Sequence, residues 1–261
     1  MPSCFWYHIA QIQEVIRMEQ RYLRTAMLTG EEAIETLKQA KVLLFGIGGV
    51  GGYVMEALAR AGVGRIDLVD HDVVAPSNLN RQIIATEATM GMKKTEAGRS
   101  RIHDINPDIE VNVFDCFYLP EEKHRFQLEQ YDFIIDAIDT VTAKIDLIIT
   151  AQQLNVPIIS SMGTGNRMDP TKVLITDLFK TSNDPLARIM RHELRKRGIR
   201  SLTVATSAEP PLKPLFQTDE NPLRRSTPGS SPFVPPAAGL AIASYVVRQL
   251  TAKGSAVCQE N

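Results

Sequence analysis

The chain has 261 residues, of which 44% are hydrophobic and 23% charged, and its formal net charge is −1. This balance is typical of a folded globular protein and excludes a disordered or fibrous one. A net charge so close to zero also excludes a uniformly basic nucleic-acid-binding protein, so any contact with RNA would depend on a local basic region.

The three cysteines, Cys4, Cys116 and Cys258, lie far apart in the sequence. This spacing excludes a disulfide framework and a Cys-x-x-Cys zinc site, and it favours a reducing cytoplasm as the location. The apolar stretch 233–247 is shorter than the roughly 20 residues that span a bilayer, so we expect a buried helix there and no membrane partner. Residues 1–20 carry no signal-peptide pattern, and we expect a disordered extension or a start codon placed too early.

Apolar stretches rich in branched residues alternate with helix-period stretches over the first 160 residues. Such alternation predicts βαβ units, hence an α/β fold with a Rossmann-like, mostly parallel sheet and helices on both faces. Strands are expected at 41–45, 65–69, 109–114, 132–135 and 157–160, and helices at 51–61, 92–105 and 142–154.

The pattern changes in the last hundred residues. Eight prolines lie between residues 208 and 236, a density that argues against a helix or a central strand and favours a long loop or lid. We therefore expect C-terminal strands, a proline-rich loop and a packing helix after the first five strands. The expected elements are strands at 172–176 and 201–205, helices at 185–197 and 237–250, and the loop at 208–236.

A glycine-rich loop, Gly46-Ile-Gly48-Gly49-Val-Gly51, follows the first expected strand and opens the first expected helix. The backbone N–H groups of such a loop, together with the helix N-terminus, bind phosphate groups. Its spacing also fits the dinucleotide fingerprint, and Asp70 ends the next strand, where a ribose-binding acid is expected. An oxidoreductase that binds NAD is therefore one alternative.

The segment after Asp70 favours a nucleoside triphosphate. Arg81 offers a planar fork of donors and Lys94 a point charge, and two cations suit a triphosphate better than a nicotinamide. Asp136 and Asp139 lie just past another expected strand, at the carboxyl end of the sheet, where ligands bind. A carboxylate there can hold Mg²⁺ against phosphates. Each residue alone has an ordinary structural explanation, but their order along the strand ends favours ATP.

Together these motifs resemble the adenylating superfamily that includes the ubiquitin-activating enzymes and the bacterial activators of sulfur-carrier proteins. The resemblance covers residues 21–163. The segments that carry it are Arg21-Tyr-Leu-Arg24, the glycine-rich loop, Asp70-His-Asp72, Asn78-Leu-Asn-Arg-Gln82, Gly91-Met-Lys-Lys94, Ile105-Asn-Pro107 and Asp136-Ala-Ile-Asp139.

The resemblance implies an ATP-binding adenylation core at 21–165 and a portion of the same domain at 166–255 that faces the substrate. Asp139 would hold Mg²⁺, and Arg24 would reach the ATP of a neighbouring subunit, which implies a homodimer. The implied catalytic residues are Arg24, Arg81, Lys94 and Asp139. The implied ATP-binding residues are Gly46, Gly48, Gly49, Gly51, Asp70 at the ribose, Asp72, Asn78, Arg81, Gln82 and Lys94; Asp72 and Gln82 have no assigned task.

Three later segments, 160–170, 176–187 and 219–222, look like the tRNA threonylcarbamoyladenosine dehydratase branch of this superfamily. That likeness implies that ATP activates the threonyl carboxylate of a modified adenosine beside the anticodon, which then closes into a cyclic form. Such a reaction needs no protein nucleophile, because a nitrogen of the same substrate captures the acyl adenylate. The cysteines of this chain suit it, since none stands in an activated position.

Two further alternatives stay open. The chain could adenylate the C-terminus of a ubiquitin-like or sulfur-carrier protein, or it could sense ATP without turning it over. A sulfur-carrier or desulfurase partner is also left open. The expected helix 185–197 carries Arg188, Arg191, Arg195 and Lys196, and this basic face is either a binding surface for tRNA phosphates or simply solvated.

Overall fold

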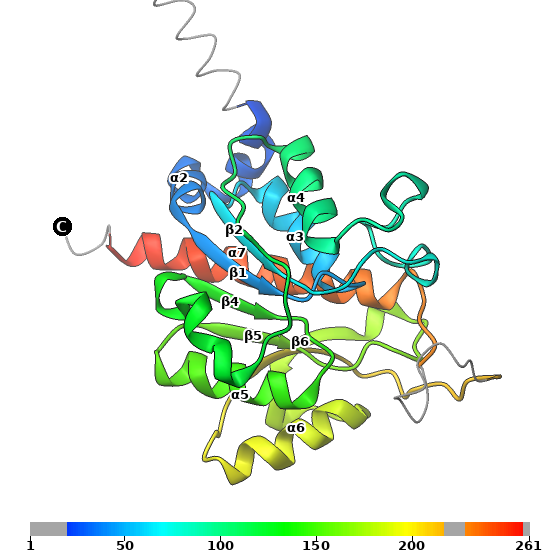
Figure 1. Cartoon of the computed structure of the whole chain (residues 1–261). Coiled ribbons are helices and arrows are strands. Elements are labelled where there is room, and N and C mark those ends of the chain that lie inside the picture. The colour runs from blue at the N-terminus through cyan, green and yellow to red at the C-terminus, as the bar shows by residue number, and fades with distance from the viewer. Residues whose placement is uncertain (1–19, 217–227, 258–261) are drawn as a thin grey trace, which may run out of the picture.

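A computed structural model describes residues 20–216 and 228–257 of the chain. Seven strands in this part form one sheet in the order β3-β2-β1-β4-β5-β7-β6 (Figure 1). All neighbouring pairs are parallel except β6 and β7. The Rossmann-like, mostly parallel sheet expected from the sequence is confirmed. The strands are β1 Lys41–Phe45, β2 Arg65–Val69, β3 Val113–Phe114, β4 Phe133–Asp136, β5 Ile158–Ser161, β6 Val173–Asp177 and β7 Thr203–Ser207.

The expected strand at 109–114 is wrong in length. Only Val113 and Phe114 form regular strand pairs with β2, and Glu110 adds one isolated bridge to Arg65. Glu110 and Asn112 place polar side chains within this stretch, and the two-residue strand lies at one edge of the sheet. The other strands agree with the sequence to within two residues at each end.

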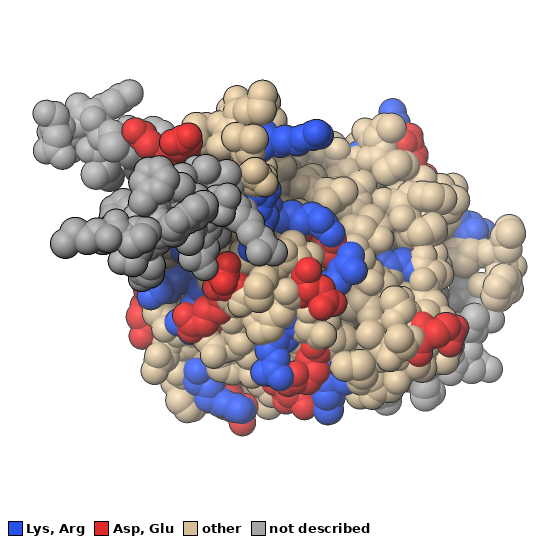
Figure 2. Space-filling model, turned by 90° about the horizontal axis from the view of Figure 1, so that it is seen from above, with Lys and Arg blue, Asp and Glu red and all other residues tan. Residues whose placement is uncertain are grey.

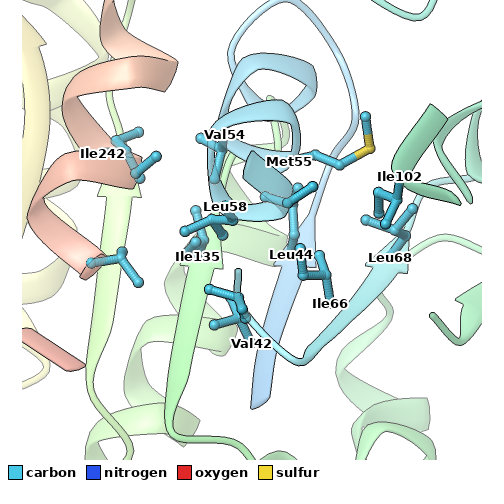
Figure 3. Packing of buried hydrophobic residues seen from close by; sticks show 14 of the residues in the cluster. Val42, Leu44, Val54, Met55, Leu58, Ile66, Leu68, Ile102, Ile135 and Ile242 are labelled. Carbon is cyan, nitrogen blue, oxygen red and sulfur yellow. The ribbon is translucent and has the colours of Figure 1, made fainter. Parts of the chain in front are cut away.

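Each inner strand sends alternate side chains to two separate cores. In β1, Val42 and Leu44 pack into one core and Leu43 and Phe45 into the other, all fully buried. This alternation follows from the two-residue period of a strand whose two faces are both covered. Figure 3 shows the first core, in which side chains of β1, β2 and β4 meet those of α3, α4 and α7.

The helices cover both faces of the sheet. One face carries α3, α4 and α7, and the other carries α5 and α6 (Figure 1). The helices are α2 Glu31–Gln39, α3 Gly51–Ala61, α4 Lys94–Ile105, α5 Val141–Gln153, α6 Pro185–Lys196 and α7 Val234–Val257, with short 3₁₀ turns at Pro76–Asn78, Glu87–Thr89, Pro120–Phe126, Leu128–Gln130, Pro170–Lys172 and Leu178–Lys180.

Two helices before β1 have no counterpart among the expected elements: residues 20–29 are helical, and α2 follows Gly30. The amphipathic pattern of α2 could have revealed it, since Ala33, Ile34 and Leu37 are buried on one side. Nothing tests the expectation for residues 1–20, because residues 1–19 lie outside the described part.

The proline-rich segment ends earlier than expected. Helix α7 begins at Val234 and takes Pro235 and Pro236 into its first turn. Proline is tolerated there because the first N–H groups of a helix have no partner within it. Residues 208–216 and 228–233 contain no regular helix or strand, and residues 217–227 lie outside the described part. No helix among the described residues is long and apolar enough to cross a membrane.

Candidate functional site

The candidate site lies where the chain leaves the sheet in opposite directions. Strands β1 and β4 are parallel neighbours, whereas β2 lies on the far side of β1 and β5 on the far side of β4. The loops that follow β1 and β4 therefore diverge and leave a crevice at the carboxyl ends of the strands. In open α/β sheets ligands bind at such a switch point.

The glycine-rich loop, whose residues are half-buried or buried, borders this crevice. Gly46 has a φ of +86°, and a Cβ atom on it would stand 2.6 Å from the carbonyl oxygen of Ala137, which follows β4. A Cβ atom on Gly51 would stand 1.8 Å from the carbonyl oxygen of Gly46. Only glycine fits these two positions. Gly48 differs, because its nearest neighbour in such a test is the Gln82 side chain at 3.9 Å, which leaves room above the loop.

Asp70, at the end of β2, supports the loop. Its Oδ2 accepts a hydrogen bond from the backbone N–H of Ile47 at 2.7 Å, and its Oδ1 accepts one from the N–H of Asp72 at 2.9 Å. The carboxylate is half-buried at the carboxyl end of the sheet. It thus occupies the position that the sequence assigns to a ribose-binding acid, although its role there stays a prediction.

Lys94 and Asp72 form an ion pair at the start of α4. Lys94 is 5% exposed, and its Nζ lies 2.7 Å from Oδ2 of Asp72. The other carboxylate oxygen of Asp72, Oδ1, lies 2.9 Å from Nε2 of His71. The backbone also joins them, since the Lys94 N–H donates to the Asp72 carbonyl at 2.9 Å. A lysine this deeply buried carries a charge that is little screened by water.

The segment 76–82 lies over the glycine-rich loop. The Cγ atom of Arg81 is 3.3 Å from where a Cβ atom on Gly49 would stand, and the Arg81 Nη1 donates to the carbonyl of Ser77 at 2.8 Å. Asn78 is buried, and its Oδ1 accepts the N–H of Ala75 at 3.1 Å. Arg81 therefore lies beside the loop, while Asn78 shapes the segment that carries it.

Gln82 is 6% exposed and has one orphaned polar atom. Its Oε1 is buried with no hydrogen-bond partner among the described residues. An unsatisfied buried oxygen raises the free energy of the folded state unless something supplies a donor. The atom of Gln82 that lies nearest to Gly48 is its amide nitrogen Nε2, so a donor of this side chain borders the crevice while its oxygen lacks a partner.

The turn after β4 brings two acids to the crevice with different surroundings. Asp136 is fully buried, accepts the N–H of Ile138 at 3.1 Å and the hydroxyl of Ser160 at 2.6 Å, and pairs with Lys144. Asp139 is exposed, and Thr140 rather than Asp139 is the residue that precedes α5. The turn therefore carries one buried acid and one exposed acid.

The sequence did not predict that Lys144, Asp136 and Ser160 contact one another in the interior. A signal for Lys144 was available, because it lies three and four residues before the buried Leu147 and Ile148 and hence on the apolar side of α5. A lysine on that side of a helix indicates a buried partner. No such signal exists for Ser160, whose contact with Asp136 depends on the pairing of β4 with β5.

The expected RNA-binding residues lie apart from the crevice, on α6. Arg191 donates to the carbonyl and hydroxyl of Thr181, and the guanidinium of Arg195 stacks 5.4 Å from the ring centre of Phe179. Lys196 pairs with Glu193 at 3.1 Å. Arg188 is exposed and makes no such contact with any described residue. The basic face is therefore partly engaged within the protein.

Arg24 lies outside the crevice of its own chain. It is exposed on the helix 20–29, which is held at Tyr22 by a 2.6 Å hydrogen bond from Asn106 and by packing against Gly62. Gly62 caps the end of α3 remote from the glycine-rich loop, and an 11-residue helix is about 16 Å long. The structure does not bring Arg24 to the other candidate residues.

A family model described as the ThiF family matches residues 21–256 of this chain. This chain belongs to the ThiF family. Within this family it is 41% identical over 242 residues to the tRNA threonylcarbamoyladenosine dehydratase of Bacillus subtilis, covering 89% of this chain and 95% of that protein.

Solved structures agree with the ThiF-family assignment. The crystal structure of the Escherichia coli tRNA N6-threonylcarbamoyladenosine dehydratase in complex with ATP has a TM-score of 0.82 and 34% identity, with 91% of this chain and 96% of that chain covered. The same enzyme in complex with AMP has a TM-score of 0.83 over the same coverage. The predicted resemblance is thereby confirmed.

Proposed function

We propose that this ThiF-family chain catalyses the ATP-dependent dehydration of threonylcarbamoyladenosine in tRNA. The observation that carries the proposal is the 41% identity to a dehydratase along nearly the whole of both chains. The crevice agrees with it, because Arg81 lies against the glycine-rich loop, Asp70 accepts a hydrogen bond from that loop, and Lys94 pairs with Asp72, two residues after Asp70. The related enzyme is solved with ATP and with AMP, the substrate and the product of an adenylation.

The chain's own groups suit each part of ATP. The N–H groups of the glycine-rich loop and the cations of Arg81 and Lys94 would neutralise the phosphates, and Asp70 would accept from the ribose. Room for a phosphate exists above Gly48, and the nearest atom to that space is the Gln82 amide nitrogen Nε2, a hydrogen-bond donor. Binding at such preorganised groups stabilises charge that develops during the reaction.

Asp139 is the acid that we assign to Mg²⁺. An exposed carboxylate two residues after the contact between Ala137 and Gly46 fits this hard cation, which prefers carboxylate and phosphate oxygens. The cation would supply charge neutralisation at the phosphates.

The reaction balances without a protein nucleophile. A threonyl carboxylate oxygen attacks the α-phosphorus of ATP, and pyrophosphate leaves. A nitrogen of the same nucleoside then attacks the acyl carbon and loses its proton, and AMP leaves with the carboxylate oxygen. Cys116 is unsuited to intercept the adenylate, because burial raises the pKa of its thiol.

Helix α6 is the surface that we assign to tRNA. Its basic residues Arg188, Arg191, Arg195 and Lys196 follow one another along a helix that starts at the carboxyl edge of the sheet, where Asp184 accepts the N–H groups of Gly163 and Ala187. On the face of the molecule seen in Figure 2, basic and acidic side chains are intermixed. Helix α6, with its run of basic residues, therefore suits the binding of tRNA phosphates better than the mixed-charge face in Figure 2 does.

A homodimer completes the proposal. The helix 20–29 exposes Leu23, Met27 and Leu28 to 55%, 78% and 88%, and beside it lies a cavity of about 470 Å³ lined by residues of this helix, α3 and α7. Neighbouring exposed apolar side chains indicate a protein interface. Arg24 belongs to this face and would act on the ATP of the second copy.

The alternatives predict other products. An activator of a ubiquitin-like or sulfur-carrier protein would release pyrophosphate only when that protein is present, and a nicotinamide enzyme would bind NAD and release none. A sensing module would bind ATP without turnover. A cytoplasmic location follows from the proposed tRNA substrate, and a sulfur-relay partner stays open.

One incubation separates these functions. The protein is mixed with ATP, Mg²⁺ and tRNA that bears threonylcarbamoyladenosine, and AMP and the mass of the nucleoside are measured. We expect one AMP for each nucleoside that loses one water. AMP without a change in nucleoside mass would exclude the tRNA substrate. No AMP would also exclude it and would leave the carrier-protein activator, the nicotinamide enzyme and the sensing module as alternatives.

A further inference from the structure

The turn between β4 and α5 carries Asp139, and Ala137 of the same turn lies against Gly46 of the glycine-rich loop. The turn itself has no regular structure. Directly beneath it lies Lys144, the fourth residue of α5, with no exposed surface. Charged side chains are rarely buried completely, because taking them out of water is costly unless they are paired. The contacts of Lys144 show what it holds.

Lys144 binds the residue that precedes Asp139. Its Nζ donates to the carbonyl oxygen of Ile138 at 2.9 Å and pairs with Oδ2 of Asp136 at 3.0 Å. The other oxygen of Asp136, Oδ1, accepts the N–H of Ile138 at 3.1 Å. The two members of the ion pair thus hold both backbone polar groups of Ile138.

The same turn is tied to its surroundings on two further sides. The N–H of Ala137 donates to the carbonyl of Phe45 at 2.8 Å, and the carbonyl of Ala137 stands against Gly46. The hydroxyl of Ser160 on β5 donates to Asp136 at 2.6 Å. A shift of the Ile138 peptide would therefore change the position of Asp139 relative to the glycine-rich loop.

We propose that Lys144 is a positioning residue for the adenylation reaction: by holding the Ile138 carbonyl, its ammonium group fixes the Asp139 carboxylate at the place where Mg²⁺ meets the triphosphate. The inference rests on the proposed function, and in particular on the role of Asp139. Lys144 itself touches neither ATP nor the cation. An apolar side chain would fill the same space without desolvating a charge, but it has no donor for the Ile138 carbonyl.

The test needs variants that leave no buried charge without its partner. Lys144→Met alone would strand the Asp136 carboxylate and could unfold the protein. The double variant Asp136→Asn with Lys144→Met is neutral, and asparagine still has an oxygen for the Ile138 N–H. Its matched control is Asp136→Asn with Lys144→Gln, because glutamine is close to methionine in size and carries an amide donor.

The measurement is ATP binding to the full-length protein by calorimetry, with and without Mg²⁺, together with the melting temperature. We expect the methionine double variant to melt close to the wild type and to bind ATP alone as the wild type does. Its gain in ATP affinity on adding Mg²⁺ should fall at least about tenfold, the order of the effect that residues supporting a metal ligand have. The glutamine control should recover most of that gain.

Two results would overturn the inference. One is an unchanged Mg²⁺ effect in the methionine double variant, and the other is an equal loss of ATP affinity with and without Mg²⁺, which would make the ion pair a general support of the fold. Asp139→Asn separates this failure from failure of the proposed function. If Asp139→Asn removes the Mg²⁺ effect and the methionine double variant keeps it, only the positioning role of Lys144 is wrong. If neither variant changes the Mg²⁺ effect, the assignment of Asp139 to Mg²⁺ is wrong.

Discussion

At the scale of single residues, the proposed chemistry depends on side chains that lie around the glycine-rich loop. Asp70 accepts from the loop itself, Arg81 lies against Gly49, and Lys94 is held by Asp72. The sequence predicted these residues because each follows a strand end or a glycine motif. It could not predict that Lys144 supports the Asp139 turn, since that contact depends on how α5 packs on β4.

We expect Arg81→Ala and Asp139→Asn each to reduce AMP formation at least about a hundredfold, because Arg81 would neutralise phosphate charge and Asp139 would hold Mg²⁺. Circular dichroism and the melting temperature should stay at wild-type values, since neither side chain belongs to the buried core. Glu129→Gln, an exposed acid near the amino end of β4, is the control and should keep full activity. Wild-type turnover in either test variant would contradict its assigned role.

Two glycine substitutions separate the fold of the loop from its ligand. Gly51→Ala should destabilise the protein by about 2–3 kcal/mol, because its new Cβ atom meets the Gly46 carbonyl at 1.8 Å. Gly48→Ala meets nothing closer than 3.9 Å, so it should melt like the wild type but bind ATP at least about tenfold more weakly. Thermal melts and ATP titrations measure both. Normal ATP affinity in Gly48→Ala would mean that phosphates do not lie above this residue.

At the scale of elements, local sequence patterns predicted which helices and strands exist better than they predicted the residues at which these begin and end. The buried runs of β1, β2, β4 and β5 and the period of α3 gave those elements from sequence. The helix α2 and the length of β3 were not predicted correctly, because α2 has only nine residues and the stretch 109–114 alternates apolar and polar residues although only its last two form regular strand pairs. The start of α7 could not be placed, since proline is compatible with both a loop and a first helical turn.

Helix α6 gives a prediction that distinguishes its arginines. Arg188→Glu should weaken tRNA binding about three- to tenfold, because one phosphate contact is lost. The logarithm of the affinity should then fall less steeply with the logarithm of the salt concentration, by about one unit of slope. Arg191→Glu should weaken tRNA binding and also lower the melting temperature, since Arg191 bonds to Thr181. Affinity is measured by titration at several salt concentrations.

The control for this series is Arg248→Glu on α7, which packs against the other face of the sheet. It changes the net charge by the same amount and should leave tRNA affinity unchanged. Equal effects of Arg188→Glu and Arg248→Glu would mean that binding depends on overall charge and that α6 is merely solvated.

At the scale of the whole molecule, the order of the strands creates the site. The sequence predicted the strands and their parallel arrangement, but the order β3-β2-β1-β4-β5-β7-β6 and the antiparallel β6 depend on long-range packing. Because β4 lies next to β1, residues about ninety positions apart meet, as the contact of Ala137 with Gly46 shows. The dimer is likewise a property of the assembled surface and stays a prediction.

Mixed dimers test whether Arg24 acts across the interface. Arg24→Ala and Asp139→Asn should each be inactive alone, because every site then lacks one group. After the two variants are mixed and allowed to exchange subunits, a dimer with one of each contains one site with both groups, so AMP formation should reappear at up to about a quarter of the wild-type rate by random pairing. No recovery, with exchange confirmed by mass spectrometry, would contradict a role for Arg24 in trans.

The central claim is that ATP adenylates a carboxylate of tRNA, and the fate of one oxygen tests it most directly. The threonyl carboxylate of the modified nucleoside is labelled with a heavy oxygen isotope, the reaction is run to completion with ATP and Mg²⁺, and AMP is analysed by mass spectrometry. The account predicts that one labelled oxygen appears in AMP for each fully labelled nucleoside that is dehydrated. Unlabelled AMP, with the isotope found in phosphate, pyrophosphate or water, would contradict it.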